Sequence, residues 1–250
     1  MPIHEYAFGS VPLLLGCAVK VRDFLRALLL CAFPVSALLV AGTAAAWAQE
    51  RLTGRVSLFI HVFDLQREYV IATWIESLLF VLCALVFVLL GWSPASKTAL
   101  NPLRRFIYRC FAFGFFVLAG DEMLMLHERV GEALQKMTGF LKDTPAEGTP
   151  FAWMIFYGPA AVAVVAAMLW ASVGLLRRCP LRDAVRRGTR ALGAAVAMVA
   201  VAFAAEAAAA YLAAHGTWNT PLPVFEESAE LAALLSFAWA HLEIAFGYEL

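Results

Sequence analysis

The sequence predicts an all-α, polytopic membrane helix bundle with six transmembrane helices, and three observations carry this prediction. Hydrophobic residues make up 62% of the 250 positions and charged residues only 15%, whereas soluble domains carry about 25% charged residues. The apolar residues gather in uncharged runs, and about 20 such residues cross a bilayer core of about 30 Å. Turn-forming residues separate the runs. We therefore expect a single integral membrane domain over residues 1–250.

Hydropathy places the six spans at about residues 24–48, 70–92, 106–126, 151–176, 191–214 and 228–247. The first span follows three basic residues and ends in Ala46-Trp47-Ala48, which has the small-x-small form of a signal-peptidase site. Its apolar run is long for a signal peptide, and roughly 20 residues precede it. We interpret the run as a retained helix, and partial cleavage of residues 1–48 is the alternative.

The remaining elements are delimited by turn chemistry. Asn101-Pro102 precedes the third span, Cys179-Pro180 follows the fourth, and two prolines precede the sixth. The fifth span is rich in alanine, which favours close packing of helices. Between the first two spans, apolar residues recur at helical spacing within residues 50–69. This pattern predicts a short helix that lies in the outer membrane interface.

Basic residues favour one orientation of the bundle. With the N-terminus inside, most of the 19 Lys and Arg residues fall on the cytoplasmic side, namely Lys20, Arg22, Arg26, Lys97, Arg104, Arg105, Arg109, Arg177, Arg178, Arg182, Arg186, Arg187 and Arg190. The positive-inside rule then places both termini in the cytoplasm of a bacterial inner membrane. The basic inner loops suit anionic lipid, and the sequence offers no nucleic-acid surface.

Acidic and histidine residues converge at the outer level of several spans. The third span ends in an Asp-Glu-x4-His-Glu segment, the fifth carries one acid within an apolar run, and the sixth opens with Glu-Glu-x2-Glu. The candidate residues are Asp121, Glu122, His127, Glu128, Glu206, Glu227 and Glu230. Helical periodicity puts Asp121 and Glu128 on one stripe and turns Glu122 and His127 away from it. Glu76 lies deeper in the second span.

An ionised carboxylate near the middle of a span costs on the order of 2.5–3.5 kcal/mol. The outer half supplies few basic partners, which favours shared protons or a bound metal. Carboxylates and a histidine that point into a four-helix bundle build di-metal sites, and such ligands suit iron, manganese or zinc. The sequence therefore predicts a carboxylate-rich metal site at these seven residues, although the Glu-x-x-His pairs of soluble di-iron bundles are absent.

Structural roles are the alternatives for single residues. Glu227 lies near the start of a helix, where the dipole favours acids, and Glu122 has Arg129 nearby as an ordinary ion-pair partner. His127 suits a solvated outer helix, and His241 suits a satisfied core position. Glu206 has no such explanation, because neither a loop nor a helix cap accounts for an acid there.

The Asp-Glu-x4-His-Glu and Glu-Glu-x2-Glu segments together resemble those of a family of uncharacterised bacterial inner-membrane proteins, over the region from the third to the sixth span. The resemblance implies no activity. Three functional hypotheses follow from the residues: a metalloenzyme that acts on a lipophilic substrate at the outer leaflet, an accessory subunit that packs on other membrane subunits, and a proton or cation carrier. In the carrier hypothesis, His241 and Glu243 are the only evident residues that could relay a proton towards the cytoplasm.

Overall fold

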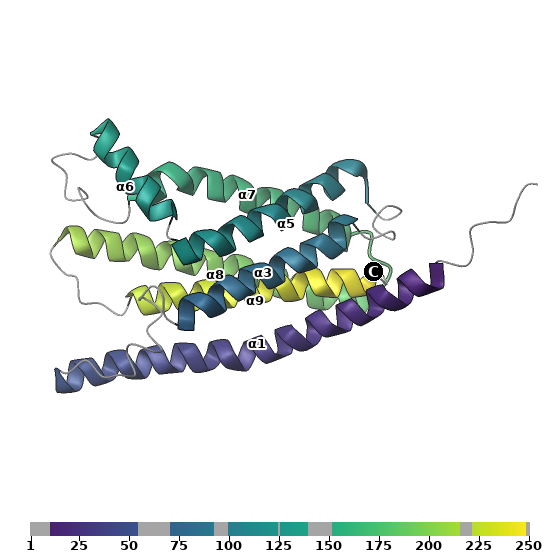
Figure 1. Cartoon of the computed structure of the whole chain (residues 1–250), viewed down its shortest axis with the longest axis horizontal. Helices are drawn as coiled ribbons and strands as arrows, with labels where there is room; N and C mark the ends of the chain where they lie inside the picture. Colours follow the sequence, from purple (N-terminus) through teal and green to yellow (C-terminus); the bar gives the residue numbers. More distant parts are fainter. Residues whose placement is uncertain are drawn as a thin grey trace, which may run out of the picture.

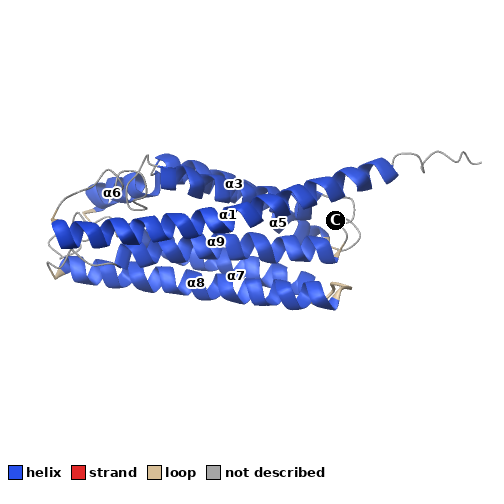
Figure 2. Ribbon diagram, turned by 90° about the horizontal axis from the view of Figure 1, so that it is seen from below, coloured by secondary structure: helices blue, strands red, loops and turns tan. Residues whose placement is uncertain are grey.

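The computed structural model describes residues 11–54, 71–92, 100–124, 126–139, 152–215 and 222–248, and these form an all-α bundle (Figure 1). Its helices are α1 (Val11–Thr53), α3 (Ile71–Trp92), α5 (Pro102–Leu124), α6 (Leu126–Thr138), α7 (Ala152–Leu176), α8 (Arg182–Ala214) and α9 (Leu222–Gly247). No strand occurs within these ranges (Figure 2). The predicted fold class is therefore confirmed.

Five helices, namely α1, α3, α7, α8 and α9, contain segments that are long and apolar enough to cross a membrane. α5 meets the same condition only together with α6, and the two helices are bent by 79° relative to each other. Charged residues at both ends of α5 explain why this helix alone is not apolar enough. The chain is thus a multi-pass membrane protein, and its described residues contain five candidate spans, or six if α5 and α6 form one bent span.

The helices extend beyond the predicted spans chiefly at their N-terminal ends. α1 begins at Val11 and α8 at Arg182, whereas α3, α7 and α8 end at Trp92, Leu176 and Ala214 as predicted. Hydropathy detects the part of a helix that suits lipid, while polar turns continue the helix outside it. The predicted interfacial helix lies largely outside the described residues, since α1 continues to Thr53 and residues 55–70 are not described.

α5 begins with a well-defined N-terminal cap. The side-chain oxygen of Asn101 accepts a hydrogen bond of 2.9 Å from the backbone N–H of Arg104, which satisfies one of the free donors of the first turn. Pro102 occupies the first helical position, where its fixed φ suits the helix and its missing N–H costs nothing. This cap fixes the start of α5 and thereby the position of Arg104 in its first turn.

The core of the bundle lies where α3, α5 and α9 meet. Phe87 of α3 is almost completely buried and packs against the rings of Phe115 at 5.2 Å and His241 at 4.6 Å. α8 packs most extensively against α9, and both helices carry buried alanines, among them Ala205 and Ala229. Small side chains allow such a close approach, as the alanine-rich sequence of this span predicts.

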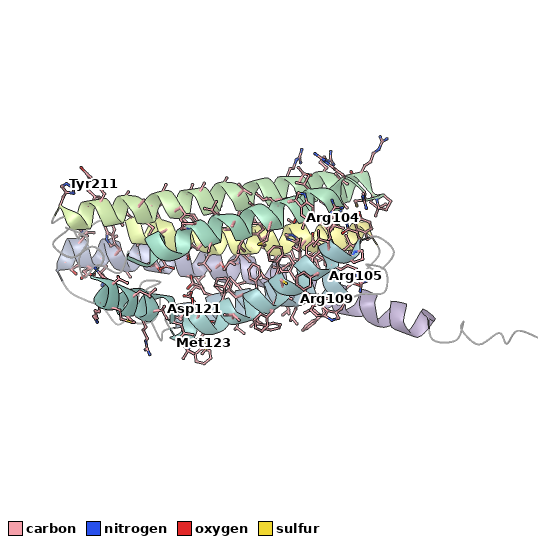
Figure 3. All side chains as sticks on the ribbon, turned by 90° about the horizontal axis from the view of Figure 1, so that it is seen from above. Arg104, Arg105, Arg109, Asp121, Met123 and Tyr211 are labelled. Atoms are coloured by element: carbon pink, nitrogen blue, oxygen red, sulfur yellow. The ribbon has the colours of Figure 1, made fainter. Side chains whose placement is uncertain are left out.

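Charges separate along the long axis of the bundle. Arg104, Arg105 and Arg109 lie at one end and Asp121 at the other (Figure 3). We call the end with these arginines the basic end and the end with Asp121 the acidic end. α7 carries no charged residue, and the only charged residue of α3 is Glu76.

One ion pair ties α8 to α9 near the basic end. The Nε of Arg187 donates to Oε2 of Glu243 at 2.9 Å, and the Glu243 side chain is only 5% exposed. Arg187→Ala is expected to lower the free energy of unfolding by roughly 1–3 kcal/mol, because it leaves a buried carboxylate without its partner. Unfolding in detergent, followed by circular dichroism, measures this loss. The control is Arg186→Ala, which breaks only an exposed pair with Asp183 and should cost less than about 0.5 kcal/mol; equal losses would contradict the assignment.

Candidate site: a glutamate cluster beside an apolar cavity

Glutamates from four helices gather near the acidic end of the bundle. Glu76 of α3 is 5% exposed, shares a side-chain hydrogen bond with Glu122 of α5, and interacts electrostatically with Glu227 and Glu230 of α9. Glu227 also interacts with Glu206 of α8. These five residues, Glu76, Glu122, Glu206, Glu227 and Glu230, are called the glutamate cluster below.

The hydrogen bond inside the cluster sets its chemistry. Glu76 and Glu122 interact with each other, and two ionised carboxylates, which only accept hydrogen bonds, repel each other unless a proton or another cation lies between them. The other carboxyl oxygen of Glu76, Oε1, is buried without a hydrogen-bond partner. A buried polar atom without a partner costs free energy unless something binds it. The cluster is therefore built to take up protons or another cation.

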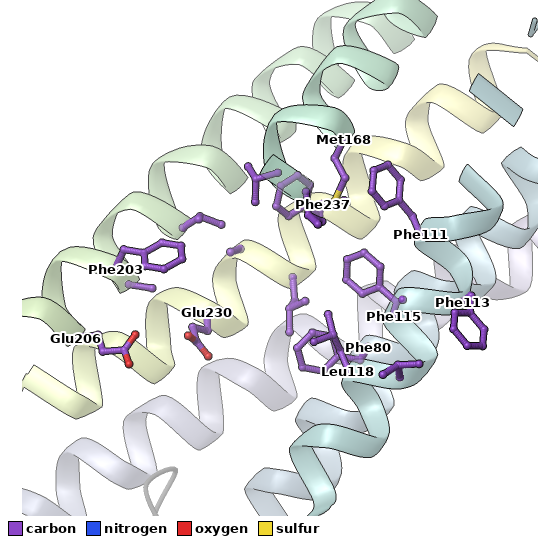
Figure 4. A pocket seen from close by; sticks show the side chains of 18 residues that line it. Phe80, Phe111, Phe113, Phe115, Leu118, Met168, Phe203, Glu206, Glu230 and Phe237 are labelled. Atoms are coloured by element: carbon purple, nitrogen blue, oxygen red, sulfur yellow. The ribbon is translucent and has the colours of Figure 1, made fainter. Parts of the chain in front are cut away.

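A cavity of about 570 Å³ adjoins the cluster. Its lining comes from α3, α5, α7, α8 and α9 and is apolar except for Glu206 and Glu230, with six phenylalanines: Phe80, Phe111, Phe113, Phe115, Phe203 and Phe237. Glu206 and Glu230 lie near each other at one end, and Phe111 and Met168 lie at the other (Figure 4). Glu206 is buried, whereas Glu230 is open to the cavity. The cavity thus has one acidic end and an aromatic body.

The structure brings together four of the seven predicted site residues: Glu122, Glu206, Glu227 and Glu230. Asp121 is half-buried on α5, and its neighbour Glu122 interacts with the cluster. The predicted stripe of Asp121 and Glu128 assumes one straight helix, whereas the bend between α5 and α6 separates these two residues. Glu122 precedes the bend, as Asp121 does.

The predicted metal site stays a prediction. Within the described part of the chain, no three His, Cys, Asp or Glu side chains lie close enough to hold a metal ion. His127 and Glu128 belong to α6, but their side chains fall outside the description.

Glu76 is the residue that the predicted site omits. The sequence places it within an apolar run, which is the same signal that singles out Glu206. Glu76 lies deeper in the second span and is not among the seven predicted site residues. The packing of α3 against α5 and α9 places Glu76 among the acids Glu122, Glu227 and Glu230 of these two helices.

The two residues that the carrier hypothesis places on a proton route, His241 and Glu243, both have partners in the structure. Glu243 is paired with Arg187. His241 is completely buried, contacts Ser172 Oγ through Nε2 at 2.7 Å, and contacts the Phe237 carbonyl through Nδ1 at 2.8 Å. Both histidine nitrogens thus have partners within the core, which supports the structural interpretation of this residue.

The fold and the site together define a class: an all-α, multi-pass membrane protein with a glutamate cluster at one end of an apolar cavity. Residues 11–244 match a family described as a domain of unknown function (DUF8692), and the chain belongs to this family. This agrees with the resemblance to an uncharacterised family that the acidic segments indicate. Neither the curated proteins nor the solved structures give a match.

Proposed function

We propose that this protein binds a lipophilic cation in the cavity between α5, α7, α8 and α9, and that the glutamate cluster releases protons in exchange. The single observation that carries the proposal is the lining of the cavity, which is apolar and aromatic apart from Glu206 and Glu230 at one end. An apolar lining with a few placed polar groups is typical of ligand sites.

The lining favours a cationic head over an anionic or zwitterionic one. Carboxylates attract cations, and aromatic faces such as those of Phe203 and Phe237 bind organic cations through their quadrupoles. No Lys or Arg is among the residues that line the cavity. A volume of about 570 Å³ lies within the usual range of about 300–1,000 Å³ for small-molecule sites. The occupant we propose has an apolar or aromatic body and a positive head.

The hydrogen bond between Glu76 and Glu122 links binding to protons. A cation that enters beside Glu230 stabilises the ionised form of the neighbouring carboxyls, so the cluster gives up a proton when the ligand binds. By linkage, raising the pH then strengthens binding and lowering it weakens binding. This coupling to protons distinguishes the proposed binding of a cation from the binding of an uncharged apolar molecule.

Filling the cavity tests the proposal. Ala202 is buried and lines the cavity, whereas Ala200, on the same helix, is exposed and does not. Ala202→Phe is expected to lower the affinity for tetraphenylphosphonium by at least about tenfold, because it fills space that the ligand needs. Equilibrium dialysis with detergent-purified protein measures this affinity.

Ala200→Phe is the matched control, and we expect it to bind as the wild type does. Equal affinities of all three proteins, with unchanged melting temperatures, would overturn the proposed site. If the affinity does not depend on pH between 5 and 8, the proposed proton exchange is contradicted, but the proposed binding site is not.

A divalent metal at the cluster is the second candidate, and the gathering of glutamates from four helices supports it. Here Glu122, Glu227 and Glu230 would provide oxygen ligands, and Asp121, His127 and Glu128 would complete the set. A bound metal would supply Lewis-acid or redox chemistry on a lipophilic substrate. Elemental mass spectrometry of wild type beside Glu230→Ala decides: one or two equivalents of iron, manganese or zinc, lost in the variant, would favour this candidate.

For location, we propose the inner membrane of a bacterium, with both termini in the cytoplasm. The support is the positive-inside rule applied to the basic end, where Arg104 and Arg109 lie in the N-terminal part of α5 and Arg187 lies in that of α8. The glutamate cluster then faces the outer leaflet.

A further inference from the structure

A second hollow lies at the basic end of the bundle, and its chemistry is opposite to that of the first. It has a volume of about 430 Å³ and is lined by Arg104 of α5, by Leu169, Trp170, Val173 and Gly174 of α7, and by Arg177 and Arg178 directly after α7. Three arginines and no acid line it. Such a set of like charges repels itself unless an anion binds between them.

Arg104 is held in place but lacks partners for its donors. Its guanidinium stacks over the Trp170 ring, with Cζ 5.2 Å from the ring centroid. Its Nε and Nη1 atoms are buried and have no hydrogen-bond partner. Guanidinium donors that are buried without an acceptor cost free energy, so an acceptor at this position would be stabilising.

Gly174 makes room for this arrangement. A β-carbon at Gly174 would collide with Cζ, Nη2 and Nε of Arg104, so only glycine lets the guanidinium lie against the α7 backbone. The Leu175 carbonyl does not compete for it, because it already accepts bonds from Arg178 N and from the Tyr248 hydroxyl. Arg104 thus lines the hollow with two donor nitrogens still without an acceptor.

We infer that this hollow binds a phosphate group, and specifically the phosphate of an anionic lipid. Guanidinium groups match the geometry of phosphate oxygens, and basic pockets between transmembrane helices bind anionic head groups. Leu169 and Val173 extend from the arginines along α7, which gives an acyl chain an apolar surface to follow. The half-exposed Trp170 suits the interface between head groups and acyl chains.

The test uses delipidated full-length protein in neutral detergent, with melting temperature as the readout. Phosphatidylglycerol is expected to raise the melting temperature with an apparent affinity at least about tenfold above that of phosphatidylcholine. Arg104→Ala should abolish this preference. Gly174→Ala should weaken it while every charge is kept, because it displaces the guanidinium; Gly193→Ala is its control, since a β-carbon there meets nothing within 4 Å.

Each possible result either supports or contradicts the proposed phosphate site. If phosphatidylglycerol protects Arg104→Ala and Gly174→Ala as well as it protects the wild type, the site is overturned. If inorganic phosphate alone gives the same protection, and Arg104→Ala loses it, the phosphate site stands but a soluble phosphate compound rather than a lipid is its ligand. Neither result depends on Glu206 or Glu230, so the cavity proposal is tested separately.

Discussion

Replacing Glu206 and Glu230 together with glutamine is expected to lower the affinity for tetraphenylphosphonium by roughly 10²–10⁴. The two carboxyls are the only charged side chains in the cavity lining. A charged interaction contributes about 1.5–3 kcal/mol, and each 1.4 kcal/mol corresponds to a factor of ten. Glutamine keeps the size and the hydrogen-bonding capacity of glutamate, so the loss reports the charge alone. Equilibrium dialysis at pH 7 and 8 gives the affinities.

Two controls separate charge from packing. Triphenylphosphine oxide has a similar aromatic body without a positive charge, and its binding should change by less than about threefold in the double variant. Glu50→Gln removes an exposed acid at the end of α1 that does not line the cavity, and it should bind the cation as the wild type does. If the double variant binds the cation as tightly as the wild type does, the proposed role of these two carboxyls in cation binding is wrong.

His241→Ala is expected to lower the free energy of unfolding by about 3–5 kcal/mol, which is the cost of truncating a large buried ring. The ring is completely buried, and its centroid lies 4.6 Å from the centroid of the Phe87 ring. It also bridges Ser172 of α7 and the Phe237 carbonyl of α9, so the variant creates a cavity and removes two polar contacts at once. Unfolding in detergent by increasing denaturant measures the loss.

His215→Ala is the control for this prediction. His215 is exposed after the end of α8, where its ring lies 4.2 Å from that of Tyr211, and its removal should cost less than about 1 kcal/mol. A His241 variant as stable as the wild type would contradict the packing role. It would also reopen the hypothesis that His241 is a step in a proton route.

Much of the architecture follows from the sequence because hydropathy and charge act locally along the chain. The ends of α3, α7 and α9 at Trp92, Leu176 and Gly247 coincide with the predicted ends of their spans. The bend after Leu124 does not follow from hydropathy, because a helical stripe is counted as if the helix were straight. As a result, Asp121 on α5 and Glu128 on α6 do not continue one straight stripe.

What the sequence determined by itself is the class of protein, its helices, and the presence of costly acids such as Glu206 in apolar runs. Tertiary packing alone decided which of these acids meet. Glu76 and Glu227 are far apart in the chain, and they interact only because α3 packs against α9. The cavity and the arginine hollow arise in the same way, since a void is a property of facing helices and not of any one segment. The free energy of a buried charge depends on its neighbours, so its role is settled only in three dimensions.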